Sequence, residues 1–321
     1  MWKPLLSICI PTYNREKTLK RLLDSIVHQR WFTHEVEIVI DDWPSTDHTK
    51  ELAQEYIKKY PNIRYFRNKA IWMQPALLEA ISLSNWIYTR LFWSDDLMYQ
   101  DSLEITLNII KKHSPTLILY KWAVINNIEK HKTTSSKEPK ISYDIFKWFS
   151  AFWDYLAQDN QKDRFDKTNF FSSICISCFR TWYYNEMIEF TKKNICSFDE
   201  LKWHYFNFIL ILYSNLSIND AICVIDSPRM VFGVLSNTSS RAPNPKITKD
   251  SKMMMNYIKN KYPLSKGCIK LLNKISFGWR LSCKIIGPIR KNFPFISKLL
   301  NHPLGQKLWW KVYYKLTNLF K

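Results

Sequence analysis

Glycine is scarce in this sequence and tryptophan is unusually common. The chain has 5 Gly and 14 Trp among its 321 residues, whereas average glycine usage near 7% would give about 22 in a chain of this length. Glycine and tryptophan together number 19, close to an ordinary glycine content alone. The imbalance bears on turn positions discussed below, because glycine is the residue that most readily adopts a positive φ.

The sequence also lacks long apolar runs and paired cysteine motifs. No run approaches the roughly 18 residues that cross a bilayer, and Phe206–Tyr213 is among the longest. We expect no signal peptide, because a strand-like segment follows the first residues almost at once. The seven cysteines are scattered and odd in number, which favours reduced thiols in a cytosolic protein. Cys175 and Cys178 form a lone C-x-x-C pair, which we interpret as two inward-facing strand residues.

Acidic residues are absent from the C-terminal segment. Residues 251–321 contain 15 Lys or Arg and no Asp or Glu, and they carry most of the net charge of +19. Near the end of the chain, a basic helical stripe runs beside an apolar one, namely Lys307, Lys311 and Lys315 beside Leu308, Val312, Leu316 and Leu319. These features predict a helix lying on an anionic membrane surface. The alternative is a helix packed on the rest of the chain with a solvated lysine face. No nucleic-acid module is recognisable, so no nucleic-acid partner is expected.

Short apolar runs alternate with amphipathic stretches over the first 120 residues. The predicted strands are Leu5–Ile10, Val36–Ile40, Ile63–Phe66, Ile87–Phe92 and Thr116–Tyr120, and the predicted helices are Glu16–Gln29, a stretch around Leu52 to Ile57, Pro75–Leu83 and Ser102–Lys112. This alternation is typical of an α/β fold with a doubly wound, mostly parallel sheet. The pattern weakens after about residue 122, where we expect a polar loop at 129–142, helices at 146–156 and 201–213, and strands at 170–179 and 221–225.

Two pairs of adjacent carboxylates come at the ends of predicted strands. Asp41-Asp42 ends the second strand, and Asp95-Asp96 follows the fourth. In doubly wound sheets, ligands bind at the carboxyl ends of the strands. Adjacent carboxylates repel each other, so a fold keeps them solvated or neutralises them with a cation. The pattern predicts a divalent metal and a phosphorylated ligand at Asp95-Asp96; for Asp41-Asp42, helix capping and turn formation are the alternative.

Three motifs, in this order, resemble those of the family 2 glycosyltransferases of the GT-A fold. They are Ser7-Ile-Cys-Ile-Pro-Thr-Tyr-Asn-Arg15, Ile38-Val-Ile-Asp-Asp-Trp-Pro-Ser-Thr-Asp-His-Thr49 and Ser94-Asp95-Asp96. The resemblance covers residues 4–120 strongly and 165–241 weakly. It implies a Rossmann-like sheet with a nucleotide-sugar-binding half at 1–122, an acceptor-binding half at 123–245 and a basic, helical, membrane-associating extension at 246–321.

The resemblance also implies roles for residues at the strand ends. The loop that would cradle the nucleotide comprises Pro11, Thr12, Tyr13, Asn14 and Arg15. Asp42, with Asp41 beside it, matches the carboxylate that reads the base, and a carboxylate accepts strongly from uracil N3–H or a guanine donor edge. Asp95 and Asp96, with Asp96 the stronger candidate, would bind the Mg²⁺ or Mn²⁺ that bridges the donor pyrophosphate.

The catalytic base is expected in the second half of the chain. The family's usual carboxylate precedes an apolar helix, and His204 occupies the matching position. A neutral imidazole can deprotonate a hydroxyl near neutral pH. Asp199 and Glu200 are the carboxylate alternatives one turn upstream, and a purely structural histidine is the other interpretation of His204. Arg229 and Arg241 would contact the pyrophosphate.

Four tryptophans depart from the family pattern. Trp43, Trp72 and Trp86 stand near or at positions where members typically have glycine, and Trp93 stands where many have the first Asp of the metal motif. Glycine serves a positive φ or a close approach to a ligand, and tryptophan meets neither need. We hypothesise that several of these tryptophans are glycines in the natural protein, mis-assigned through a reassigned UGA codon, which lies one base from both a Trp and a Gly codon. The competing hypothesis is a diverged, inactive relative that binds nucleotides or glycans.

Together these features predict an inverting, metal-dependent glycosyltransferase. It would move a sugar from a nucleotide-diphosphate sugar to a hydroxyl of a glycan or lipid-linked saccharide acceptor, in cell-envelope polysaccharide biosynthesis. The basic segment predicts a cytoplasmic protein, peripheral on the inner face of the plasma membrane.

Overall fold

The computed structural model describes residues 5–68, 79–84, 86–125, 143–147, 151–152, 155, 176–185 and 221–233, with single positions at 259, 260, 266, 269 and 273. For residues 121–125 and 226–233 the description covers the backbone alone. The loop predicted at 129–142, the helix predicted at 201–213 and nearly all of the basic segment lie outside these residues.

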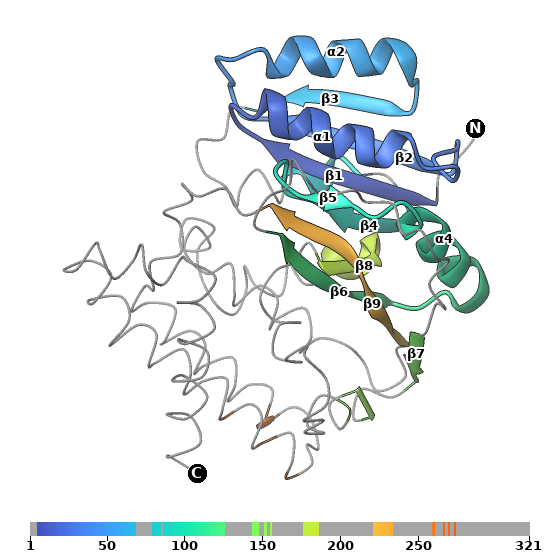
Figure 1. Ribbon diagram of the computed structural model, residues 1–321. Helices are drawn as coiled ribbons and strands as arrows, with labels where there is room; N and C mark the ends of the chain where they lie inside the picture. Colours follow the sequence, from blue (N-terminus) through green and yellow to red (C-terminus); the bar gives the residue numbers. More distant parts are fainter. Residues whose placement is uncertain are drawn as a thin grey trace, which may run out of the picture.

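The first four strands form a parallel half-sheet (Figure 1). The strands β1 (Leu6–Thr12), β2 (Val36–Asp42), β3 (Ile63–Arg67) and β4 (Tyr88–Leu91) lie in the order β3-β2-β1-β4, with helices α1 (Glu16–Val27) and α2 (Thr49–Lys59) linking the first three. This confirms the predicted alternation. Strand β2 extends to Asp42, so the first carboxylate pair belongs to the strand itself. Of the helix predicted over 75–83, residues 79–82 are described and helical.

The second half of the sheet is mixed. Its elements are β5 (Leu97–Met98), α4 (Ser102–His113), β6 (Leu117–Ile125), β7 (Tyr143–Phe146), β8 (Ser177–Arg180) and β9 (Ile222–Gly233). The order continues as β4-β8-β6-β9-β5, with β7 also paired to β9. Strand β8 runs antiparallel to both β4 and β6, and among the described strands of this half β6 and β9 alone pair in parallel. The predicted parallel order therefore holds throughout the first half and in the β6–β9 pair, and the sheet as a whole is mixed, in part because β8 enters between β4 and β6 from a distant part of the chain.

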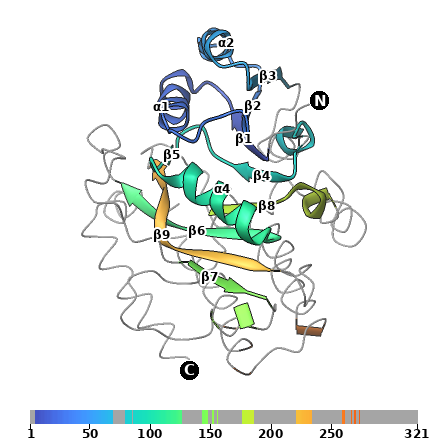
Figure 2. The ribbon, with the colours of Figure 1, turned by 90° about the vertical axis from the view of Figure 1, so that its right-hand side faces the viewer.

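The two faces of the half-sheet have different partners. Ile8 pairs with Ile38 on one side and with Arg90 on the other, so these three side chains share a face. Arg90 is fully buried and donates to the Ser102 hydroxyl of α4 at 2.8 Å. This face therefore packs beneath α4, which lies against the middle of the sheet (Figure 2). Burial of the aliphatic residues on it is complete and supplies the main stabilisation.

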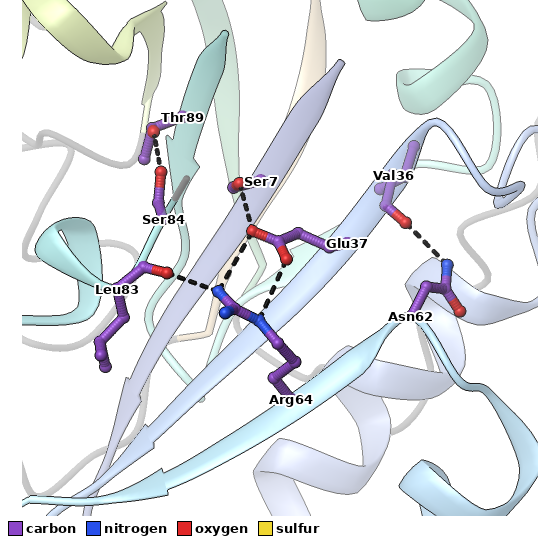
Figure 3. A network of polar contacts seen from close by, with 8 residues as sticks. All are labelled: Ser7, Val36, Glu37, Asn62, Arg64, Leu83, Ser84 and Thr89. Carbon is purple, nitrogen blue, oxygen red and sulfur yellow. Dashed lines mark hydrogen bonds and ion pairs between the residues drawn. The ribbon is translucent and has the colours of Figure 1, made fainter. Parts of the chain in front are cut away.

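The opposite face carries a buried polar network (Figure 3). The carboxylate of Glu37 accepts from Ser7 Oγ at 2.6 Å and forms an ion pair with Arg64 Nε at 3.1 Å. Arg64 also donates to the carbonyl of Leu83, where the helical turn before β4 ends. Burial raises the pKa of Glu37, while the contacts with Ser7 and Arg64 oppose that rise. The network joins β1, β2 and β3 to the segment that leads into β4.

Candidate functional site

The loop after β1 is tied to the loop after β2. Asn14 has a φ of 50°, in the left-handed region. Its backbone N–H donates to Ser45 Oγ at 2.9 Å, and its side-chain Oδ1 accepts from the N–H of Thr46 at 2.8 Å. The N–H of Trp43 donates to the carbonyl of Thr12 at 2.9 Å. Residues 12–16 and 43–49 therefore form one unit, which we call the loop pair.

The first amides of α1 are also engaged within the loop pair. The N–H of Arg15 donates to Thr49 Oγ1 at 3.2 Å, and the N–H of Glu16 donates to Asp47 Oδ2 at 3.2 Å. Amides at a helix N-terminus otherwise attract anions. Here the protein supplies the acceptors itself, so contacts to a nucleotide depend on other groups of the loop pair.

Asp42 is buried and both of its carboxylate oxygens accept hydrogen bonds. Ser45 Oγ donates to Oδ1, and the hydroxyl of Tyr65 on β3 donates to Oδ2 at 2.7 Å. Burial raises the pKa of Asp42, while the hydrogen bonds from Ser45 and Tyr65 oppose that rise. The carboxylate predicted to read the base is thus committed to two side chains of the protein.

Asp41 differs from its neighbour in having one open oxygen. Its Oδ2 accepts from Asn68 Nδ2 at 3.1 Å. Its Oδ1 and the hydroxyl of Thr12 are buried atoms with no hydrogen-bond partner within the described part of the chain. Burial raises the pKa of Asp41 to about 7. A buried polar atom without a partner is costly, so the open Oδ1 of Asp41 marks a place where a polar ligand would be stabilised. Thr12 pairs with Asp42 and therefore lies on the other face of the sheet.

Two aromatic rings of the loop pair contact each other. The rings of Tyr13 and Trp43 have centroids 6.2 Å apart and planes tilted by 40°. Tyr13 is half exposed, whereas Trp43 is partly buried. The exposed ring of Tyr13 offers a stacking surface to a planar ligand at the same strand ends as Asp41.

The second carboxylate pair lies in a turn directly after β4. The N–H of Asp96 donates to the carbonyl of Trp93 at 3.0 Å and closes the turn. Asp96 is only 2% exposed, while Asp95 is partly exposed. Because β4 pairs with β1 in parallel, this turn and the loop pair both lie at the carboxyl ends of the parallel strands.

The described residues contain no group of three His, Cys, Asp or Glu side chains that would enclose a metal ion. Asp95 and Asp96 nevertheless fit a hard divalent cation, since Mg²⁺ is commonly held by one or two carboxylates while substrate phosphates and water complete its ligands. The pair suits a metal that arrives with a phosphorylated ligand.

Helix α1 connects the two parts of the site, which sequence reasoning missed. Ser25 Oγ accepts from the N–H of Met98 at 3.1 Å, and Gln29 Oε1 accepts from the N–H of Leu103 at 3.0 Å. The helix begins at the loop pair. Ser25 in its last turn and Gln29 just beyond its end hold the segment that follows the Asp95-Asp96 turn. The signal in the sequence is two polar residues four positions apart at the end of an amphipathic helix.

The tryptophans at glycine positions do not require left-handed backbone. Among the described residues other than glycine, a positive φ occurs at Asn14 and Ser114, and so not at Trp43, Trp86 or Trp93. The indole N–H of Trp43 is buried without a hydrogen-bond partner in the described part of the chain. A glycine at that position would avoid this cost, so close approach of a ligand remains the reason to expect glycine there.

Most of the site residues predicted in the second half of the chain lie outside the described residues. His204, Asp199, Glu200, Arg241 and also Trp72 lie outside the described residues. Arg229 lies on β9, where the backbone alone is described and runs parallel to β6. Their predicted roles remain predictions.

Comparison with known proteins decides the family. The profile of Glycosyl transferase family 2 matches residues 7–186, more than half of the chain. The chain belongs to glycosyl transferase family 2. The match includes the loop pair and the Asp95-Asp96 turn, so the family predicted from three motifs is confirmed.

Curated relatives match about a third of the chain. Abequosyltransferase RfbV of Salmonella typhimurium is 40% identical over 103 residues, which are 32% of this chain and 31% of the relative. Chondroitin synthase of Escherichia coli is 31% identical over 117 residues, 36% of this chain and 17% of the relative. The chain therefore aligns with less than a third of the length of these family members.

Solved structures extend the likeness to nearly the whole chain. S. aureus TarS 1-349 in complex with UDP-GlcNAc superposes with a TM-score of 0.61 at 16% identity, covering 92% of this chain and 79% of TarS 1-349. The mannosyltransferase PcManGT from Pyrobaculum calidifontis, in complex with GDP-Man and Mn²⁺, gives a TM-score of 0.54 at 12% identity, covering 99% and 84%. At these identities the likeness concerns the fold, and it confirms the GT-A arrangement predicted for this family 2 member.

Proposed function

We propose that the protein is an inverting glycosyltransferase that moves a sugar from a nucleotide-diphosphate sugar to a hydroxyl of a glycan or lipid-linked saccharide. The observation that carries the proposal concerns Asp41 Oδ1, a buried oxygen without a hydrogen-bond partner in the described part of the chain. It lies at the carboxyl ends of the parallel strands, as does the Asp95-Asp96 turn. A base-reading group and a phosphate-associated metal pair are the two features that a nucleotide-sugar donor requires. Family membership and the transferase names of the curated relatives support the same activity.

The nucleotide would bind at the loop pair. Ionised Asp41 would accept an N–H of the base through Oδ1, while the exposed ring of Tyr13 would stack on it. Pro11, Thr12, Asn14 and Arg15 would frame the ribose and phosphates. Asp42 stays in the donor-binding set, and its hydrogen bonds to Ser45 and Tyr65 favour a supporting role.

A divalent cation, Mg²⁺ or Mn²⁺, would be held by Asp95 and Asp96, with Asp96 as the stronger ligand. When bound, it would neutralise charge on the departing nucleoside diphosphate. The complex of PcManGT with GDP-Man and Mn²⁺ supports this proposal. The Asp95 carboxylate is the more exposed of the two, which would let it face the incoming donor.

The proposed roles in activating the acceptor are argued from the sequence. His204 would remove the proton of the acceptor hydroxyl as its oxygen attacks the anomeric carbon, with Asp199 and Glu200 as alternatives. Arg229 and Arg241 would contact the pyrophosphate. Residues 1–122 would bind the donor and residues 123–245 the acceptor.

We further propose that the basic extension at 246–321 holds the enzyme on the inner face of the plasma membrane. The 15 Lys or Arg and the lack of acid over residues 251–321 support an anionic lipid surface as the partner. Within the described part of the chain, no helix is both long and apolar enough to cross a bilayer. The acceptor would then be a lipid-linked or other cell-envelope saccharide.

A donor-hydrolysis screen tests the activity. Purified full-length protein is incubated with UDP-, GDP- and dTDP-sugars in the presence of Mn²⁺ or Mg²⁺, and release of the nucleoside diphosphate is measured. We expect release from one nucleotide class, abolished by chelation of the metal. Nucleotide binding without release from any donor, also after an acceptor mixture is added, would instead indicate the inactive relative.

A further inference from the structure

Three side chains form a hydrogen-bonded relay from the edge strand β3 to the loop after β1. The hydroxyl of Tyr65 donates to Asp42 Oδ2 at 2.7 Å, Ser45 Oγ donates to Asp42 Oδ1, and the N–H of Asn14 donates to Ser45 Oγ at 2.9 Å. Because the hydroxyl of Ser45 donates its proton to Asp42, its lone pairs face the amide of Asn14. We call these four residues the Tyr65 relay.

The relay ends on the one strained residue of the loop pair. A left-handed backbone costs a residue other than glycine of the order of 1 kcal/mol, though asparagine tolerates it better than most. Asn14 has this conformation, with a φ of 50°. Its amide is held by Ser45 and its side chain by Thr46. These contacts add to the tolerance of asparagine for the left-handed state and hold the loop in it.

Residues at the end of β3 make two further hydrogen bonds to the segment that contains Asp42 and Ser45. Arg67 Nη2 donates to the carbonyl of Ser45 at 3.3 Å, and the N–H of Asn68 donates to the carbonyl of Asp42 at 2.8 Å. The last residues of β3 thus hold both the side chain and the backbone of the segment that supports Asn14. The bond from Asn68 belongs to the β2–β3 ladder, which pairs Ile38 to Asp42 with Ile63 to Arg67, whereas the side-chain contacts of Tyr65 and Arg67 are additional to that ladder.

We propose that Tyr65 is a positioning residue for donor binding, acting through Asp42 and Ser45 to set the conformation of Asn14 and its neighbour Tyr13. The inference rests on the proposed binding of the donor nucleotide at the loop pair. It assigns a role in donor affinity to a strand β3 side chain that lies outside every motif identified in the sequence. In this role both carboxylate oxygens of Asp42 accept hydrogen bonds from the protein, from Ser45 and from Tyr65.

The chain supplies a matched control in Tyr56. Its hydroxyl donates to the carboxylate of Asp24, which also pairs with Lys20 at 2.7 Å, and this contact joins α2 to α1 away from the loop pair. Burial followed by the hydrogen bond to its aspartate raises the pKa of each of the two tyrosines. Tyr65→Phe and Tyr56→Phe therefore remove the same atom from the same kind of pair.

Binding of UDP and of GDP to the full-length variants, with Mg²⁺, tests the proposal by calorimetry. We expect Tyr65→Phe and Ser45→Ala each to weaken binding roughly tenfold, as for loss of a hydrogen bond to a charged group, and Ser45→Thr to restore it. Tyr56→Phe should change binding less than about twofold while lowering the melting temperature comparably. In a double-mutant cycle, Tyr65→Phe should have little further effect once Ser45 is Ala. Equal binding by wild type and Tyr65→Phe, equal weakening by Tyr56→Phe, or additive effects would overturn the relay.

Amide hydrogen exchange separates failure of the relay from failure of the proposed function. The peptide covering residues 12–16 should exchange faster in Tyr65→Phe than in wild type, and at the wild-type rate in Tyr56→Phe. This readout needs no ligand. If the wild type binds neither nucleotide, the proposed function fails, and the exchange rates alone then decide whether the relay exists. Unchanged exchange in Tyr65→Phe would overturn the relay whatever the binding result.

Discussion

The carboxylates of Asp41 and Asp42 lie on opposite faces of β2, and their hydrogen bonding differs accordingly. Asp42 accepts from Ser45 and Tyr65, whereas Asp41 accepts from Asn68 and keeps a buried Oδ1 with no partner within the described part of the chain. Consecutive strand residues face opposite ways. One residue therefore supports the loop pair, and the other is available to a ligand.

Nucleotide affinity should depend on pH through Asp41. Burial raises the pKa of Asp41 to about 7, and an N–H of the base would prefer the ionised carboxylate. Affinity should therefore rise roughly tenfold between pH 6 and pH 8, measured by calorimetry with UDP or GDP. Asp41→Asn should bind weakly and lack this rise, which separates Asp41 from titration of the phosphate groups. A wild-type profile that parallels Asp41→Asn would contradict the assignment.

The same shift fixes the sign of the effect on stability. Because the folded-state pKa of Asp41 lies above its unfolded value, its contribution to stability is greatest below about pH 4 and is lost as the pH rises toward 7. Asp41→Asn should thus be more stable than wild type at pH 8 in the absence of nucleotide. Thermal unfolding at pH 5 and pH 8 checks this, and a larger stabilising effect at pH 5 would contradict it.

Asp96→Asn should remove metal-dependent turnover. The substitution preserves size in a turn where Asp96 is nearly buried, but it removes the charge that would hold the cation. We expect donor hydrolysis to fall roughly 100-fold, with a higher Mn²⁺ concentration needed for half-maximal rate. Glu55→Gln, on the exposed side of α2, is the control. Full activity in Asp96→Asn would mean that the pair is not the metal site.

Gln29→Ala should destabilise the fold through α4. Gln29 is buried, and its Oε1 is the acceptor for the N–H of Leu103 in the first turn of α4. Leaving that amide unpaired should lower the free energy of unfolding by about 1–3 kcal/mol, measured by urea denaturation. Gln54→Ala on the exposed face of α2 is the matched control. Equal stability of the two variants would show that the contact is dispensable.

Membrane binding should require the basic segment. Full-length protein should sediment with phosphatidylglycerol vesicles but not with phosphatidylcholine vesicles, and salt should weaken binding because exposed charges are screened. Replacing Lys307, Lys311 and Lys315 by Gln in the full chain should weaken binding, and deleting residues 251–321 should abolish it. Unchanged vesicle binding in the truncated protein would rule the segment out as the anchor.

Peptide mass spectrometry of the native protein decides the tryptophan hypothesis. We expect glycine at one or more of positions 43, 72, 86 and 93. At position 43 this outcome would remove a buried indole N–H that has no partner within the described residues. Tryptophan at 43, 72 and 93 would refute the hypothesis and would make activity of the encoded pocket the first property to test.

Local sequence patterns predicted the first half of the fold because its contacts follow one another along the chain. Apolar runs at β1 and β2 and the amphipathic stripe of α1 each carry their own signal, and right-handed connections then fix a parallel order. The loop after β1 and the Asp95-Asp96 turn were located in the same way, as polar residues at strand ends. The sequence of β8 does not indicate which strands it pairs with. Its antiparallel position between β4 and β6 depends on contacts between residues far apart in the chain.

The sequence by itself determined the family, the parallel half-sheet and the edge at which the site lies, since motif order and hydrophobic period are properties of neighbouring residues. The tertiary structure decided how the carboxylates are used. Tyr65 on β3 reaches Asp42, and Asn68 just after β3 reaches Asp41, in each case from more than twenty residues away along the chain. Which oxygen stays open depends on which distant donors come within hydrogen-bonding distance, and no local pattern encodes that distance.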